Sequence, residues 1–267
     1  MISPRLAMVY NHDENNVFKV IYNRSIKKTN DASLRRAHLL SGKKGDTEDL
    51  DQFELIYNHK WGNGFTFDIN TYYSKLKLIN WDQNSHTFGP AGKVTMLGIT
   101  PKIKYTSDKL VFSLAHAYSP TINFQLPHGI EETFISAEPF GGGKHQRQWA
   151  TNNTKLYAIY KPTEKLNLYT NIDYIWGLPG TEDLAEYYNA NPQLTFPLST
   201  DGSTEMFDIA VYVNAGAKYK LKEGLQLRLD IHNIGGLFDK NLNKQDLNVV
   251  DFVRQPTYVS FGFTLKL

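Results

Sequence analysis

The last segment of the chain limits the possible folds more than any other feature. Residues 256–267 read PTYVSFGFTLKL, in which an apolar residue stands at every second position from Val259 to Leu267. Only a β-strand sorts side chains onto two faces with a period of two residues. Residues 225–232 (LQLRLDIH) repeat the alternation. These strands therefore have one wholly apolar face, which must contact either a dry core or lipid.

The polar faces of these strands favour lipid over a dry core. They carry Arg228, Asp230, His232 and Lys266, while the apolar faces carry bulky aliphatic and aromatic groups. Alternation of this kind, apolar outside and polar inside, is typical of a transmembrane β-barrel with a hydrated or filled lumen. A soluble β-sandwich also alternates, so that fold stays open as an alternative.

Composition excludes several other classes of protein. The 267 residues contain no apolar run near the roughly 18 residues that a membrane helix needs, so helical spanning is excluded. The chain has no cysteine, which excludes disulfides and cysteine-bound metals and suits an envelope protein. A formal net charge of only +2 gives no reason to expect nucleic-acid binding.

The first residues lack a secretion signal. The stretch ISPRLAMVY after Met1 has no basic region, long apolar stretch or small-residue cleavage site. An outer-membrane protein must be exported, so we expect that a segment preceding these residues is missing.

The pattern predicts eleven strands joined by connections that are alternately short and long. Short connections carry turn residues such as Gly62-Asn63-Gly64, and long ones lie at 26–49, 79–92, 119–148, 178–204 and 234–255. Bacterial outer-membrane barrels distribute periplasmic turns and extracellular loops in this way. The predicted strands are 3–11, 16–25, 50–61, 65–78, 93–106, 109–118, 149–161, 165–177, 205–220, 225–233 and 256–267.

Most predicted strands have one apolar face and one polar face. In 205–220, for example, Val211 and Val213 alternate with Tyr212 and Asn214. Residues 149–161 alternate poorly, so their facing stays undecided. Aromatic residues stand at strand ends, which fits the interfacial girdles of a membrane barrel; they are Tyr10, Trp61, Tyr105, Tyr118, Trp176 and Tyr219.

An odd number of strands cannot close a bacterial barrel, because both ends of such a barrel finish in the periplasm. The first strand would leave an open edge in the bilayer, which hydrocarbon does not tolerate. We therefore expect residues 1–267 to form a partial outer-membrane β-barrel domain.

Four stretches resemble the TonB-dependent outer-membrane receptors. Residues 2–6 (ISPRL) look like the "SPR" opening of a mid-barrel strand, and 53–57 (FELIY) resembles the family's "yElG" strand. Residues 227–240 (LRLDIHNIGGLFDK) are similar to the penultimate strand with its "N-L-hydrophobic-D-K" end. The terminal strand resembles the assembly signal, although it closes with Leu267 where Phe or Trp is commoner.

This resemblance implies the C-terminal half of a 22-stranded barrel closed around an N-terminal plug. It implies a part of a receptor in the bacterial outer membrane that imports a scarce nutrient, such as a siderophore-iron chelate or cobalamin. The implied partners are an N-terminal segment with plug and strands, TonB acting through that segment, the lipid bilayer, lipopolysaccharide and the nutrient. No cofactor is implied.

Long loops offer candidate ligand-binding residues. Cationic and aromatic side chains together suit an anionic chelate, and long connections are commonly functional. The candidates are Phe124, His128, Phe140, His145 and Arg147 in 119–148, and Tyr187 and Tyr188 in 178–204. Four basic residues of 26–49 are instead expected to meet lipopolysaccharide phosphates; they are Arg35, Arg36, Lys43 and Lys44.

The sequence gives little support for a metal site or for a catalytic site. The eight histidines form no pair at metal-binding spacing, so no protein-held metal is expected. Ser113 and His116 lie in a plain alternating strand, so we predict no catalytic residues and no enzyme activity, although a barrel hydrolase is kept as an alternative. The other alternative is a porin-like barrel closed by oligomerisation.

Overall fold

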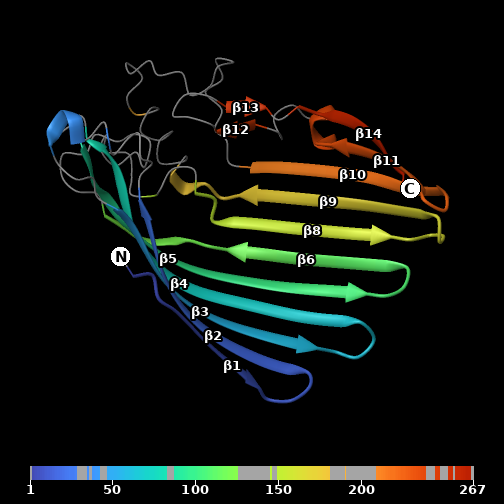
Figure 1. Ribbon diagram of the computed structural model, residues 1–267, viewed down its shortest axis with the longest axis horizontal. Helices are drawn as coiled ribbons and strands as arrows, with labels where there is room; N and C mark the ends of the chain where they lie inside the picture. The colour runs from blue at the N-terminus through green and yellow to red at the C-terminus, as the bar shows by residue number, and fades with distance from the viewer. Residues whose placement is uncertain are drawn as a thin grey trace.

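The computed structural model describes residues 2–28, 35, 38–42, 47–82, 87–125, 145, 149–180, 190, 209–238, 244–246, 252–254 and 256–265. Its main feature is one antiparallel sheet in which 11 strands follow one another as neighbours and a twelfth pairs beside them (Figure 1). The neighbouring strands are β1 (Arg5–Asn11), β2 (Asn16–Lys28), β3 (Thr47–Lys60), β4 (Phe65–Asp82), β5 (Thr87–Thr106), β6 (Leu110–Tyr118), β8 (Asn152–Tyr160), β9 (Leu166–Trp176), β10 (Ile209–Lys222), β11 (Leu225–His232) and β14 (Tyr258–Leu265).

Each of the eleven predicted strands corresponds to one strand on this path, so the predicted antiparallel meander is confirmed. In Figure 1 the short turns gather at the right-hand end of the sheet. Among the described residues, no helix is both long enough and apolar enough to cross a membrane.

The turn between β3 and β4 shows how sequence fixes the register of a hairpin. Asn63 and Gly64 have φ angles of 64° and 84°. Two consecutive residues at positive φ are typical of the type I′ turn, which matches the twist of the flanking strands and favours the sequence Asn-Gly. A Cβ atom on Gly64 would also lie 2.1 Å from the backbone oxygen of Thr106 on β5.

We predict that Gly64→Ala destabilises the protein by about 1–3 kcal/mol, because alanine at this φ is strained and its methyl group meets rigid backbone. Gly62→Ala is the matched control, since nothing lies within 4 Å of a Cβ atom at that position. Denaturant titration of both variants in lipid measures the difference. Equal stabilities would show that the turn geometry is not required.

The β1–β2 turn is held by a carboxylate. Asp13 accepts hydrogen bonds from the side chain of Asn16 at 2.7 and 2.9 Å and from the backbone N–H groups of Asn15 at 2.7 Å and Asn16 at 2.8 Å. The Asn16 side chain, followed by the Asn15 N–H, favours the ionised form and lowers the pKa of Asp13. The stabilisation is present above the usual carboxyl pKa and is lost as the pH falls through the lowered one.

Two of the predicted long connections contain strands that the prediction omitted. β7 (Thr121–Gln125) pairs with β5, and β12 (Lys244–Asp246) and β13 (Phe252–Arg254) form a separate two-stranded sheet after the 3₁₀ helix η2 (Ile234–Leu237). β7 forms because the 20-residue β5 extends beyond the end of the nine-residue β6. Beyond the interruption at Ser119 and Pro120, β7 continues the pairing, with Phe124 opposite Val94.

The two faces of the sheet differ in burial as well as in chemistry. We call the apolar face the one that carries Phe261, and the polar face the one that carries Ser74 and Asp230. Phe261 is 82% exposed, whereas Ser74 and Asp230 are 2% and 6% exposed. Side chains converge on the inner side of a curved barrel wall and diverge on its outer side. The polar face is therefore the concave one, and the apolar face points outward.

Register also settles the facing of the poorly patterned residues 149–161. Leu156 lies opposite Leu114 on β6 and Ile172 on β9, so it belongs to the apolar face. The alternation is obscured because Tyr157 and Ile159 place further apolar groups on the polar face.

Aromatic rings form a girdle on the apolar face near the short turns. The ring of Phe18 lies 6.4 Å from that of Tyr10 and stacks on Tyr57 at 4.8 Å, while His59 meets Trp61 edge-on at 4.9 Å. These rings span β1 to the end of β3, and Phe65 continues the girdle to Tyr105 at 4.6 Å. Amphipathic rings prefer the boundary between lipid and water, as the girdle prediction requires.

Candidate functional site

The concave face of the sheet carries pairs of opposite charge between neighbouring strands. Lys102 on β5 lies 3.8 Å from Asp68 on β4, and Lys155 on β8 lies 3.7 Å from Asp173 on β9. Asn58 on β3 also donates a 2.5 Å hydrogen bond to Asp68. This face can therefore meet water or polar protein groups, but it is unsuited to lipid.

Among the described residues, the most buried charge on this face belongs to a network that spans three strands. Asp230 on β11 accepts a hydrogen bond from the hydroxyl of Tyr169 on β9. Arg228 binds the same carboxylate through Nε at 2.6 Å and Nη2 at 3.0 Å, and its Nε also donates to the Tyr169 hydroxyl at 3.2 Å. The Lys218 ammonium lies 5.6 Å from the centre of the Tyr169 ring, within the range of a cation–π contact.

A glycine makes this network possible. Gly216 on β10 lies directly opposite both Tyr169 and Asp230, so the tyrosine ring must cross β10 to reach the carboxylate. A Cβ atom at Gly216 would lie 2.4 Å from the ring. Aromatic side chains that cover a glycine on a neighbouring strand are a known means of fixing register in curved sheets.

The same construction occurs a second time on the concave face. The ring of Tyr72 on β4 crosses Gly98 on β5, where a Cβ atom would lie 2.1 Å from it. Its hydroxyl bonds the Ser119 hydroxyl at 2.7 Å, just beyond β6. We call Tyr72–Gly98–Ser119 and Tyr169–Gly216–Asp230 the two tyrosine bridges; each ties together three adjacent segments of the wall.

We predict that Gly216→Ala costs about 1–3 kcal/mol, because the added methyl group displaces the Tyr169 ring from a packed position. Gly262→Ala is the control, since a Cβ atom there makes only an ordinary 3.9 Å contact with Arg228. Thermal or denaturant unfolding in lipid compares the two. A Gly216 variant as stable as the Gly262 variant would show that the bridge does not stabilise the wall.

Several polar atoms of the concave face have no partner within the described part of the chain. They are Asn70 Oδ1, Ser74 Oγ, Asn153 Oδ1 and Asp173 Oδ1. A shielded polar atom without a hydrogen bond costs about 1–3 kcal/mol, so such atoms are normally satisfied by water or by another protein segment. The concave face is thus suited to a polar neighbour.

The residues predicted to bind ligand are only partly covered by the structure. Phe124 lies on β7, where its side chain is 7% exposed and packs with Val94 and Met96. His145 is exposed. His128, Phe140, Arg147, Tyr187 and Tyr188 lie outside the described residues. Ligand binding by these seven residues stays a prediction.

Residues considered for catalysis or metal binding are separated by the fold. His116 lies on the apolar face and bonds Thr154 at 2.8 Å, whereas Ser113, three positions earlier, lies on the opposite face of the same strand. In the described part of the chain, no group of three or more histidine, aspartate or glutamate side chains could hold a metal ion. His232 lies on the concave face, as predicted, with its ring stacked 4.3 Å from Tyr258.

Comparison of the fold with solved structures gives extensive matches to barrels of TonB-dependent receptors, in their C-terminal third. The FrpB iron transporter from Neisseria meningitidis (F3-3 variant) superposes with a TM-score of 0.64 and 15% sequence identity, over 98% of this chain and 38% of that chain. BauA, the ferric preacinetobactin receptor from Acinetobacter baumannii, matches with a TM-score of 0.61 and 15% sequence identity, over 98% of this chain and 36% of that chain. FpvA of P. aeruginosa, solved with a pyoverdine–iron complex, superposes with a TM-score of 0.62 and 12% sequence identity. This match covers 98% of this chain and 32% of that chain.

The chain therefore has the fold of part of a TonB-dependent receptor barrel, as the resemblance in sequence implied. It spans about a third of the length of these structures. These neighbours are transporters and receptors, and the ferripyoverdine receptor is a protein of the outer membrane of Pseudomonas aeruginosa. No protein-family model and no curated protein matches the sequence.

Proposed function

We propose that this chain forms part of the barrel of a TonB-dependent receptor that imports a scarce nutrient across the bacterial outer membrane. The observation that carries the proposal is the two-faced sheet, with an apolar outer face, a charged concave face and neighbouring strands joined in one meander. A wall with these faces separates lipid from a polar lumen.

The concave face supports a protein plug as the neighbour in that lumen. The tyrosine bridges stiffen the wall, while Asn70, Ser74, Asn153 and Asp173 offer oxygen atoms to a polar partner. An N-terminal plug would satisfy these atoms, and TonB would act on the chain through that plug. In this proposal no residue acts as a catalyst and no cofactor is used.

The nutrient is proposed to be an anionic iron chelate or a cobalamin that binds at the long-connection end. Among the structural neighbours, FrpB is an iron transporter, BauA a receptor for ferric preacinetobactin and FpvA a protein that binds pyoverdine–iron. The cationic and aromatic groups of 119–148 and 178–204 suit such a ligand. His145, which is exposed, is the described member of this set.

Uptake in a deletion strain tests the proposal. A strain that lacks the gene for this chain is expected to lose uptake of one radiolabelled ferric siderophore or of cobalamin, and a TonB-deficient strain is expected to lose the same uptake. The gene with His145→Ala and Arg147→Ala should restore less uptake than the wild-type gene. His12→Ala, in a short turn at the other end of the sheet, serves as the control.

Two outcomes would contradict the proposal. Uptake that continues in the TonB-deficient strain and extends to unrelated small solutes would indicate the porin-like alternative. If the deletion strain takes up every tested chelate and cobalamin at the wild-type rate, the proposed transport function is contradicted.

A further inference from the structure

Hydrogen bonds from three other residues meet at Ser119, the first residue after β6. Its backbone N–H donates to the Thr151 carbonyl at 2.7 Å, and its own carbonyl accepts from the indole Nε1 of Trp149 at 2.6 Å. Its hydroxyl shares a 2.7 Å hydrogen bond with the Tyr72 hydroxyl, within one of the tyrosine bridges. Each of the three polar groups of Ser119 is therefore bonded, and each to a different residue.

Thr151 extends this network to the next strand of the wall. Its N–H and its hydroxyl both donate to the carbonyl of Gly177, at 2.8 and 3.0 Å. The Asn152 side chain donates to the same hydroxyl at 2.8 Å, so the hydroxyl hydrogen is left for Gly177. We define the base network as the five residues Tyr72, Ser119, Trp149, Thr151 and Gly177.

The backbone at Gly177 is shaped for this contact. Its φ angle is 71°, in the left-handed region that glycine adopts without strain. A Cβ atom there would lie 2.6 Å from the Thr151 hydroxyl and 3.0 Å from the amide nitrogen of the Asn152 side chain. Any larger residue at position 177 would therefore push these two side chains out of their hydrogen bonds.

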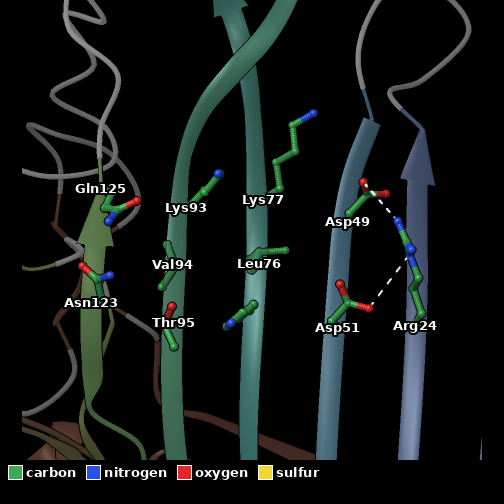
Figure 2. A pocket seen from close by; sticks show the side chains of 11 residues that line it. Arg24, Asp49, Asp51, Leu76, Lys77, Lys93, Val94, Thr95, Asn123 and Gln125 are labelled. Carbon is green, nitrogen blue, oxygen red and sulfur yellow. Dashed lines mark ion pairs between the residues drawn. The ribbon is translucent and has the colours of Figure 1, made fainter.

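Apolar packing holds the other side of the base network to the wall. Trp149 packs against a buried apolar cluster that consists of Val94, Met96 and Phe124. Phe124 belongs to β7, and Figure 2 shows β7 beside β5 with Asn123 and Gln125 labelled on it. The indole of Trp149 is thus fixed by packing and by its hydrogen bond to Ser119.

The base network joins the ends of two long connections. Ser119 begins the connection 119–148, and Trp149 and Thr151 directly follow its end. Gly177 directly precedes the connection 178–204. These two connections carry all seven residues that the sequence predicts to bind ligand. The base network therefore lies where both groups of candidate residues are attached to the wall.

We propose that the base network couples the two connections, so that they present their candidate residues to the nutrient as one pre-organised unit. Tyr72, Ser119 and Trp149 are positioning residues in this scheme, because they fix the ends of a connection and do not touch the nutrient. Ordering a binding segment in advance raises affinity, since less conformational entropy is lost on binding. The inference rests on the proposed function and deepens it.

Hydrogen exchange tests the coupling without any nutrient. Tyr72→Phe removes one hydroxyl from β4 and keeps the ring that covers Gly98. In the full receptor this variant is expected to speed exchange of the Thr151 amide, which is bonded to Gly177, about 2- to 10-fold, as the loss of one hydrogen bond does. Tyr169→Phe removes the hydroxyl of the other tyrosine bridge and should leave this amide unchanged.

A coupling between two sites acts in both directions. Gly177→Ala, made next to β9, is therefore expected to speed exchange of the Ser119 amide, which follows β6. Ser119→Ala should accelerate the Thr151 amide as Tyr72→Phe does, whereas Ser119→Thr keeps the hydroxyl and should stay near the wild type. Circular dichroism checks that the variants fold. Unchanged Thr151 exchange in Tyr72→Phe, or unchanged Ser119 exchange in Gly177→Ala, would overturn the inference.

Uptake kinetics test the consequence for binding. The probe is the radiolabelled ferric siderophore or cobalamin whose uptake the deletion strain loses. Tyr72→Phe and Trp149→Phe are expected to raise its half-saturation concentration about 2- to 10-fold at an unchanged maximal rate. A receptor that is merely less stable would instead lose maximal rate through lower abundance.

The two measurements separate this inference from the proposed function. An unchanged half-saturation concentration in a variant with faster exchange would overturn the positioning role. If the wild-type receptor takes up none of the probes, the proposed transport function and the positioning role both fail. The exchange measurements need no nutrient, so they still decide whether the two connections are coupled.

Discussion

Replacing Ile172 with arginine is expected to destabilise the assembled barrel by about 2–4 kcal/mol in a lipid bilayer. Ile172 lies on the apolar face of β9, opposite Leu156 on β8 and Val213 on β10. An arginine there must either enter hydrocarbon or pull water and headgroups towards itself, and both cost free energy.

Asn171 supplies a control at almost the same depth. It is the preceding residue on β9, lies on the concave face opposite Tyr157 and Asn214, and is exposed. Asn171→Arg should cost far less than Ile172→Arg, because the lumen side is polar. Urea titration of both variants in vesicles gives the two free energies of unfolding. Equal costs on the two faces would contradict the membrane orientation of the sheet.

The strands could be predicted from the sequence because the alternation of apolar and polar residues is local. A run such as Val211 to Asn214 shows its two faces without reference to any other part of the chain. Turn residues such as Asn63-Gly64 then set the register of neighbouring strands. These two kinds of signal were sufficient for the meander and for the outward direction of the apolar face.

The features that the sequence did not reveal depend on distant pairing. β7 exists because β5 is longer than β6, which a pattern within 119–148 cannot show. The tyrosine bridges need a glycine on the next strand at the same height, and Tyr169 and Gly216 are far apart in sequence. Interior glycines in strands are a known sign of close approach, but only the register tells which ring approaches.

Three lysines on the apolar face, Lys75 and Lys77 on β4 and Lys93 on β5, could be placed together from the sequence only in part. On β4 the apolar face runs through Phe67, Ile69 and Tyr73, and then Lys75 and Lys77 take the next two positions of the same face. A change from aromatic to cationic residues on a lipid-contacting face marks the end of the hydrocarbon layer. Lys93 joins the two lysines of β4 only through strand pairing, so the complete group needed the structure.

The two outer strands of the sheet decide how the barrel can close. β1 has seven residues and β14 has eight, and within the described residues each is paired on one side only. In an antiparallel edge strand, roughly half of the backbone N–H and C=O groups point away from the paired neighbour. In hydrocarbon each such group costs several kcal/mol, so about seven unpaired residues outweigh the 5–15 kcal/mol that typically stabilises a folded domain.

Residues 1–267 produced alone are therefore expected to aggregate or to associate with one another, and a monodisperse barrel should form only when strands from outside this range pair with β1 and β14. The measurement is native mass after detergent extraction, for the chain alone and for the chain produced together with a segment that supplies the plug and the remaining strands. A monomer of 30.5 kDa that transports the nutrient unaided would contradict the requirement for partner strands. A dimer of twice that mass that passes small solutes would instead support closure by oligomerisation, because the β14 edge of each copy would then pair with the β1 edge of the other.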